Sequence, residues 1–235
     1  NATDYYDPDK FINYAAAGGG LIGYAGAITD SVLSIKKSAS FGDVYAYSVG
    51  SKYTSPFAGG FVGQSATRMS NEVGGTMYIS SCYATGNVTS DGSRNVYTGG
   101  FSANIGATYN MFIYDCYATG DAVGSTNGTK KETDYVGAGG FIGQIDFENY
   151  TDSKPKPVYN CYSSGDAIDT YWESGKSIDS YCGSFTGYAF APIFRDCYGL
   201  ESQTIIGRHP YMPQQVKILS DEEAKLAESY TFFDF

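Results

Sequence analysis

Basic residues, histidine and long apolar runs are scarce in this chain, and each shortage excludes a class of protein. The 235 residues include 15 Lys and Arg against 25 Asp and Glu, a formal net charge of −10. Phosphate binding needs a Lys/Arg-rich face, so the charge predicts no nucleic-acid partner. No apolar run approaches the ~18 residues of a membrane span, which predicts no membrane insertion. A hydrophobic content of 42% excludes a disordered chain.

The shortage of histidine limits the chemistry available to the chain. His209 is the only histidine, and a Cys–His dyad would have to pair it with Cys197 or Cys182. We interpret His209 as a surface-loop residue, because it precedes Pro210 outside the repeats described next. The Cys-x-x-Cys, Cys-x-x-His and His-Glu-x-x-His patterns of zinc sites are absent. We therefore expect no enzyme, with no catalytic, cofactor-binding or metal-binding residues.

Two motifs alternate along the chain and define a repeat. The sequence Cys-Tyr-Ala-Thr-Gly-Asn-Val at 82–88 returns as Cys-Tyr-Ala-Thr-Gly-Asp-Ala at 116–122 and more loosely at 161–167. A worn copy occupies 38–44, and a truncated copy begins at Cys197. The second motif is built on Gly-Gly-Phe, and its Leu or Phe recurs at steps of 40, 40, 40 and 44, at residues 21, 61, 101, 141 and 185. Such a period is typical of a repeat architecture.

The period predicts an all-β fold, a right-handed parallel β-solenoid of about five imperfect ~40-residue repeats. The pattern leaves open whether each repeat makes one wide coil or two tight coils. We expect residues 1–17 to cap the N-terminal end, since an uncovered end exposes strand edges. We expect residues 18–204 to form the solenoid and residues 205–235 to form a C-terminal cap with a short helix. Ser220 and Glu223 have the spacing of a capping box at the start of that helix.

The alternation of residue types predicts which side chains face inward. In the second repeat, Cys82, Ala84 and Gly86 share one parity and are expected in the core, while Tyr83 and Asn87 face outward. The hydrophobic residue three before each Cys position has the opposite parity, so the strand must bend or bulge between them. The Gly-Gly-Phe motif predicts a sharp turn with a positive φ at glycine. The polar segments 90–94 and 124–132 predict loops.

Four of the five cysteines hold one position in successive repeats. Parallel side chains in one column rarely reach disulfide geometry, so we expect buried free thiols at Cys82, Cys116, Cys161 and Cys197. Cys182 lies outside this column.

Two further columns are candidate sites. The residue after the repeated glycine is Asp43, Asn87, Asp121 or Asp166. Stacked carboxylates could bind calcium or perform the acid–base work of polysaccharide-cleaving β-helices. Because each follows a glycine, we favour a turn in which the side chain satisfies nearby backbone N–H groups. The second column could bind sugar rings or protein, or simply stabilise the sheet, and consists of Tyr83, Tyr117, Tyr162 and Tyr198.

The motifs together resemble a known family. Gly-Gly-Phe-Val-Gly at 59–63, followed by Ile-x-x-Cys-Tyr-Ala-Thr-Gly-Asn-Val at 79–88, is similar to the GLUG motif. The resemblance spans 18–204 and is specific in the second to fourth repeats. The first repeat departs from it with Ser38-Ala39, and the fifth departs at 199–201. GLUG arrays occur on bacterial surface proteins, including IgA-specific metalloproteases and adhesin-like proteins, and have no assigned catalytic residues.

The resemblance implies a β-solenoid from a secreted, surface-attached bacterial protein. We therefore expect a non-catalytic extracellular module of a larger surface protein, which adheres to host protein or glycan or serves as a spacer. The alternative is a polysaccharide-acting β-helix enzyme or a calcium-dependent lectin-like domain. The first four residues lack the basic and apolar regions of a signal peptide, so we expect a mature chain or a piece of a longer one.

Overall fold

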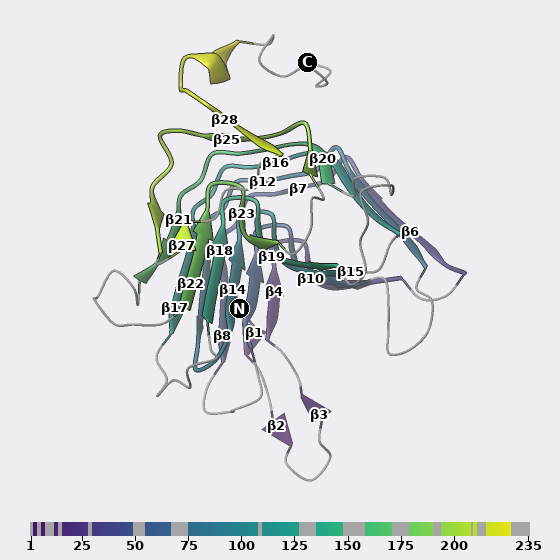
Figure 1. The fold of residues 1–235 in the computed structure, drawn as a ribbon. Coiled ribbons are helices and arrows are strands. Elements are labelled where there is room, and N and C mark those ends of the chain that lie inside the picture. Colours follow the sequence, from purple (N-terminus) through teal and green to yellow (C-terminus); the bar gives the residue numbers. More distant parts are fainter. Residues whose placement is uncertain are drawn as a thin grey trace.

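Parallel strands, each paired with its equivalent one repeat away, build this protein. The computed structural model describes residues 2–3, 6–7, 12–13, 16–27, 30–48, 55–66, 75–107, 110–126, 135–147, 158–170, 179–189, 194–207, 209–210 and 215–226. The strands stack into four sheets that together form a parallel β-solenoid, as the repeat predicted. One small antiparallel pair, β2 (Tyr6–Asp7) and β3 (Ile12–Asn13), projects away from the stacked sheets (Figure 1).

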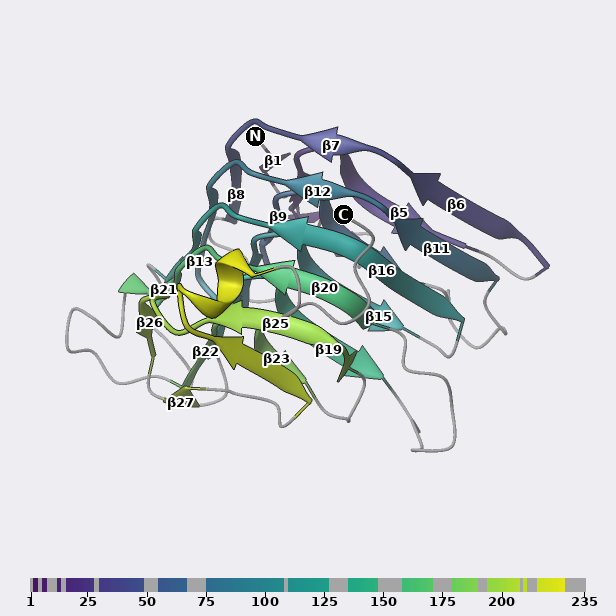
Figure 2. The same cartoon turned by 90° about the horizontal axis from the view of Figure 1, so that it is seen from above.

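Each repeat forms one wide coil that passes through the four sheets in turn. The first position, sheet 1, holds β5 (Ile22–Gly26), β10 (Val62–Ala66), β15 (Ser102–Ala107), β19 (Ile142–Phe147) and β23 (Thr186–Ala189). The second position, sheet 2, holds β6 (Val32–Lys36), β7 (Ala39–Ser40), β11 (Thr76–Ser80), β12 (Tyr83–Ala84), β16 (Met111–Ala118), β20 (Val158–Ser163), β24 (Phe194–Arg195), β25 (Cys197–Leu200) and β28 (Val216–Leu219). Figure 2 shows sheet 2 from above, with its strands side by side.

The chain then turns into two sheets that face each other. Sheet 3 holds β1 (Ala2–Thr3), β8 (Val44–Ser48), β13 (Val88–Gly92), β17 (Ala122–Thr126), β21 (Ala167–Asp169) and β26 (Ile205–Ile206). Sheet 4 holds β4 (Ala17–Gly19), β9 (Phe57–Gly59), β14 (Val96–Gly99), β18 (Tyr135–Gly139), β22 (Asp179–Gly183) and β27 (His209–Pro210). In cross-section the coil is angled, with sheets 3 and 4 in one arm and sheets 1 and 2 in the other (Figure 1).

The main core lies between sheets 1 and 2 and is centred on a ladder of phenylalanines. Phe101 stacks on Phe61 at 4.9 Å between ring centroids and on Phe141 at 4.7 Å. Phe185 continues the ladder at 4.9 Å from Phe141, and all four rings are fully buried. These residues hold the Phe position of the Gly-Gly-Phe motif, so one recurring side chain fills the centre of the second to fifth coils.

The turns before the ladder depend on glycine for a reason other than the one predicted. None of Gly59, Gly60, Gly99 and Gly100 has a φ in the left-handed region, so the expectation of a positive φ was wrong. Instead, consecutive coils approach too closely for a side chain. A Cβ at Gly60 would lie 2.0 Å from the carbonyl oxygen of Gly100 in the next coil.

The predicted loops 90–94 and 124–132 begin inside strands. Residues 90–92 belong to β13 and residues 124–126 to β17, while 127–132 lie outside the described residues. These strands were missed because their inward positions are occupied by small or polar residues such as Ser90 and Gly124, which give no apolar alternation. Ser90 is nevertheless fully buried, and its hydroxyl donates to the carbonyl of Tyr97 at 2.8 Å.

The C-terminal capping box forms, but the helix after it is short. The Glu223 N–H donates to Ser220 Oγ at 3.3 Å, and the Ser220 N–H donates to Glu223 Oε2 at 2.9 Å. A single 3₁₀ turn, Glu223–Lys225, follows. The aromatic tail beyond residue 226 lies outside the described residues. Among the residues that the structure describes, no helix is long and apolar enough to cross a membrane.

Candidate functional site

The outer side of sheet 2 is organised by a bend that recurs in every coil. The residue before each Cys position has a left-handed backbone, with φ between 49° and 54° at Lys37, Ser81, Asp115, Asn160 and Asp196. The bend changes the parity of the strand, so that Ile79 and Cys82 are both buried. The predicted bulge is therefore confirmed, and the bent residues form a column in which Lys37 and Ser81 are exposed while Asn160 is buried.

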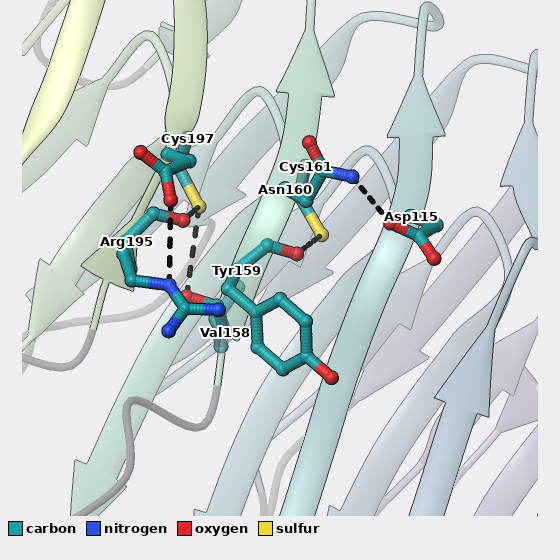
Figure 3. Close-up of polar contacts among 8 residues, drawn as sticks. Asp115, Val158, Tyr159, Asn160, Cys161, Arg195 and Cys197 are labelled. Carbon is teal, nitrogen blue, oxygen red and sulfur yellow. Dashed lines mark hydrogen bonds and ion pairs between the residues drawn. The ribbon is translucent and has the colours of Figure 1, made fainter. Parts of the chain in front are cut away.

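The cysteines are free and buried, as predicted, and each of the four thiols in the Cys column has a partner at the bend. Cys116 Sγ lies 3.1 Å from the carbonyl oxygen of Tyr114 and 3.7 Å from that of Ile79 in the preceding coil. Cys161 and Cys197 repeat the arrangement (Figure 3). In the first coil Ser38 replaces cysteine, and its hydroxyl donates to the Lys36 carbonyl at 3.0 Å. The column thus supplies a donor wherever the bend turns a carbonyl inward.

Burial also keeps two of the thiols, those of Cys161 and Cys182, in the neutral form. Desolvation raises the pKa of Cys161 well above its ordinary value, and it raises the pKa of Cys182 to about 12. Neutral thiols are poor nucleophiles and poor metal ligands. These cysteines therefore act as packing and hydrogen-bonding groups.

The Asx column forms a hydrogen-bonded ladder between coils. The Asn87 N–H donates to Asp43 Oδ1 at 2.8 Å, and the Asp121 N–H donates to Asn87 Oδ1 at 3.1 Å. The Asp166 N–H donates to Asp121 Oδ1 at 3.0 Å, and the Thr204 N–H ends the series on Asp166 Oδ1 at 2.7 Å. The side chains satisfy backbone N–H groups, as the turn interpretation predicted, but those groups belong to the next coil.

The same ladder bears on the calcium and catalytic interpretations of these residues. Each Oδ1 faces an N–H hydrogen, whose partial positive charge disfavours a cation at that oxygen. The described parts of the chain contain no group of three His, Cys, Asp or Glu side chains placed to hold a metal ion.

The only histidine, His209, lies in β27 opposite Tyr181, with Pro210 opposite Cys182, rather than in a surface loop outside the sheets. Cys197, one of the two cysteines considered as a partner for His209, lies in β25 of sheet 2, whereas His209 lies in sheet 4.

The tyrosine column lies on the outer face of sheet 2 and is a true ladder. The rings of Tyr83 and Tyr117 stack with centroids 4.7 Å apart and an interplanar angle of 3°. Tyr162 stands in register with Tyr117, and Tyr198 stands in register with Tyr162. Tyr198 is only 3% exposed, so the accessible part of the column ends at Tyr162. Phe41 ends the column in a T-shaped contact with Tyr83 at 5.5 Å and is 68% exposed.

Two further aromatic ladders share this face, and sequence analysis missed them. Tyr114 and Tyr159 stack at 4.9 Å, and the Arg195 guanidinium lies 4.9 Å from the Tyr159 ring centroid (Figure 3). Tyr78 and Phe112 stack at 5.4 Å. The signal was available, because aromatic residues recur two and four positions before the Cys position. We call this set the aromatic face, and it comprises Tyr78, Tyr83, Phe112, Tyr114, Tyr117, Tyr159 and Tyr162.

The stacking limits how the aromatic face can bind a ligand. Strands in a sheet are ~4.8 Å apart, so near-parallel rings at 4.7 Å cover one another along the stack. In each stacked pair, the neighbouring ring therefore covers one face of each ring. Such a surface combines apolar ring area with the polar tips of tyrosine and offers a partner fewer open ring faces than unstacked rings would.

A second aromatic cluster fills the angle between sheets 4 and 1. Phe57 stacks on Tyr97 at 4.9 Å, and Tyr97 meets Tyr135 edge-on at 5.7 Å. The Tyr135 hydroxyl donates to Gln144 Oε1 at 2.6 Å and lies 3.1 Å from the Tyr97 hydroxyl. Phe57, Tyr97 and Gln144 are each at least 93% buried, since their exposed fractions are 7%, 7% and 5%. This cluster packs the two arms together and leaves little surface for a ligand.

Comparisons with known proteins returned no relatives. No protein-family model matches the chain, and no curated protein or solved structure matches it.

Proposed function

We propose that this chain is a non-catalytic module of an extracellular bacterial surface protein and that the aromatic face is its contact surface for host protein or glycan. The observation that carries the proposal is the concentration of three aromatic ladders on the outer face of one sheet. Tyrosine is enriched in protein interfaces because it combines apolar area with a polar tip. The similarity of the repeats to the GLUG motif supports the extracellular setting.

Several features favour a binding module over an enzyme. The four thiols of the Cys column are buried at the bend, and the Asx oxygens accept hydrogen bonds from backbone N–H groups. Acid–base catalysis of glycoside cleavage requires two carboxyl groups that flank a bond in an open site. Asp43, Asp121 and Asp166 instead follow one another along the stack, one in each coil.

Loss of the tyrosine rings tests the contact surface. The double variant Tyr83→Ser/Tyr117→Ser removes one stacked pair from the aromatic face. Its matched control, Tyr45→Ser/Tyr47→Ser, removes a stacked pair from the outer face of sheet 3, where the centroids are 6.1 Å apart. We expect the unmodified chain to bind a component of a glycan array or of immobilised host secretions. The first variant should lose at least about tenfold in affinity, while the control retains it.

Other outcomes would change the proposal. Equal losses in both variants would mean that the aromatic face is not the contact surface. Absence of binding on every array would contradict adhesion and leave the role of a structural spacer. Binding that requires calcium, together with a calcium-dependent rise in melting temperature, would favour the lectin-like alternative.

A further inference from the structure

The N-terminal end of the solenoid contains half of a coil. Sheets 3 and 4 extend one strand beyond the first complete coil, through β1 and β4. Sheets 1 and 2 end at β5 and β6, which have a neighbour on one side only within the described residues. The described part of this end thus has the sheet 3 and sheet 4 strands of a coil without its sheet 1 and sheet 2 strands.

The register of β1 shows how that coil is placed. Ala2 pairs with Ala46, which also pairs with Ser90 of the following coil. Ala2 is therefore equivalent to Ser90, and counting back along the sequence aligns position 1 with Thr89. A residue directly ahead of Asn1 would match Val88, and the residue ahead of that would match Asn87, a member of the Asx ladder.

The exposed apolar side chains concentrate at the same end. Val32 on β6 is 69% exposed and Phe41 is 68% exposed, and Leu21 and Tyr24 are 49% and 47% exposed. In the next coil the position of Leu21 is occupied by Phe61, which is fully buried. An unpaired strand edge with exposed apolar side chains is a surface for strand addition.

The Asx ladder specifies what would fit there. Asp43 accepts from the Asn87 N–H, but no acceptor for the Asp43 N–H is recorded among the described residues. In every later coil the equivalent N–H is satisfied by the Asx side chain of the coil before. A coil with a Gly-Asx turn would supply the acceptor in the same way.

We propose that the edge formed by β5, β6 and β7 is an assembly surface for one further coil of this repeat type, added in parallel register. The coil would add parallel strands to sheets 1 and 2 and continue the Asx ladder onto Asp43. Every strand pair of the four sheets is parallel, and β1 already enters sheet 3 in that register. A second copy related by a two-fold axis would instead meet β6 antiparallel. This inference is independent of the proposed function.

An extended chain tests the proposal. A copy of residues 60–88 placed directly ahead of Asn1 would provide the missing strands, with the copied Asn87 opposite Asp43. We expect amide hydrogen exchange within 22–26 and 32–36 to slow by at least about tenfold, and the melting temperature to rise. A matched control omits the copied Val88 and so shifts the new strands by one residue, which turns their apolar side chains outward. A second control carries Asn87→Ala in the copy only.

The outcomes separate the proposal from its rivals. Protection by the in-register extension that the shifted extension does not give supports a further coil. Equal exchange rates in the two extended chains would overturn it. If the long extension aggregates, a shorter copy of residues 75–88 adds only the sheet 2 strands, and protection of 32–36 remains the readout. Sedimentation of the unextended chain completes the test, because self-association that protects β6 would assign this edge to a second copy and overturn the proposal.

Discussion

The backbone N–H of Asn87 donates to the Oδ1 of Asp43, one coil earlier, at 2.8 Å. The same bond recurs up the stack, so a side chain in each coil closes a hydrogen bond that belongs to the next. The glycine before each Asx residue makes this approach possible. A Cβ at Gly120 would lie 1.9 Å from the Gly86 carbonyl oxygen. The Gly-Asx pair therefore fixes the spacing of the coils at this corner.

Removal of one acceptor from the ladder should destabilise the protein measurably. In Asp121→Ala the Asp166 N–H loses its partner, and we expect a loss of about 1 kcal/mol in the free energy of unfolding. Asp121→Asn keeps the acceptor and should stay within about 0.5 kcal/mol of the parent. Urea denaturation measures both. Similar losses in the two variants would show that the carboxylate charge, rather than the acceptor, matters.

The bend before the cysteine should prefer glycine. Ser81 is exposed and has a φ of 54°, a conformation that costs most for β-branched side chains. We expect Ser81→Val to destabilise by roughly 1–2 kcal/mol, and Ser81→Gly to be neutral or to stabilise by up to about 1 kcal/mol. Thermal melts of these variants and of Ser81→Ala provide the ranking. A valine variant as stable as the glycine variant would contradict the role of the bend.

The phenylalanine ladder should dominate the stability of the main core. Phe101 is fully buried between Phe61 and Phe141, so Phe101→Ala leaves a cavity and should cost about 3–5 kcal/mol. Phe101→Leu retains most of the volume and should cost distinctly less. Phe112→Ala, on the half-buried aromatic face, is the matched control and should cost about 1 kcal/mol. Chemical denaturation measures the free energy of unfolding of each variant, and equal losses in Phe101→Ala and Phe112→Ala would contradict the prediction.

The thiols should be inert in the folded protein. All five cysteines are free and buried, and burial raises the pKa of Cys182 to about 12. Ellman's reagent at pH 8 should therefore titrate no thiol in the native state and all five after denaturation. Rapid reaction of one thiol in the native protein would locate a coil that opens.

Stability should fall at alkaline pH. The pKa of Cys182 rises from an ordinary value of 9.0 to about 12 on folding, so the unfolded chain releases this proton first. The contribution of the buried neutral thiol is complete below about pH 9 and is lost as the pH rises towards 12. Melting temperatures from pH 7 to 11 should decline, and Cys182→Ala should show a smaller decline. Identical pH profiles would exclude this thiol as a cause.

The sequence by itself determined the repeat, the parallel stack and the inward parity of the Cys motif. These follow from period and alternation, which depend on strand geometry alone. The bend was also predictable, because Ile79 and Cys82 cannot share a face without one. The polar strands of sheet 3 were not predictable. Ser90 can be buried because its hydroxyl donates a hydrogen bond to the carbonyl of Tyr97, and only the folded coil brings the strands of these two residues together.

Only the tertiary structure decided the path of the coil and the partners of each column. The sequence left one wide coil and two tight coils equally open, because both give the same period. It placed Asp121 in a turn, but the N–H that its side chain accepts lies in the next coil, 45 residues away. The aromatic face likewise exists because three separate columns meet on one sheet. Recurrence in the sequence specifies the columns, and the packing of coils at ~4.8 Å spacing determines what each column contacts.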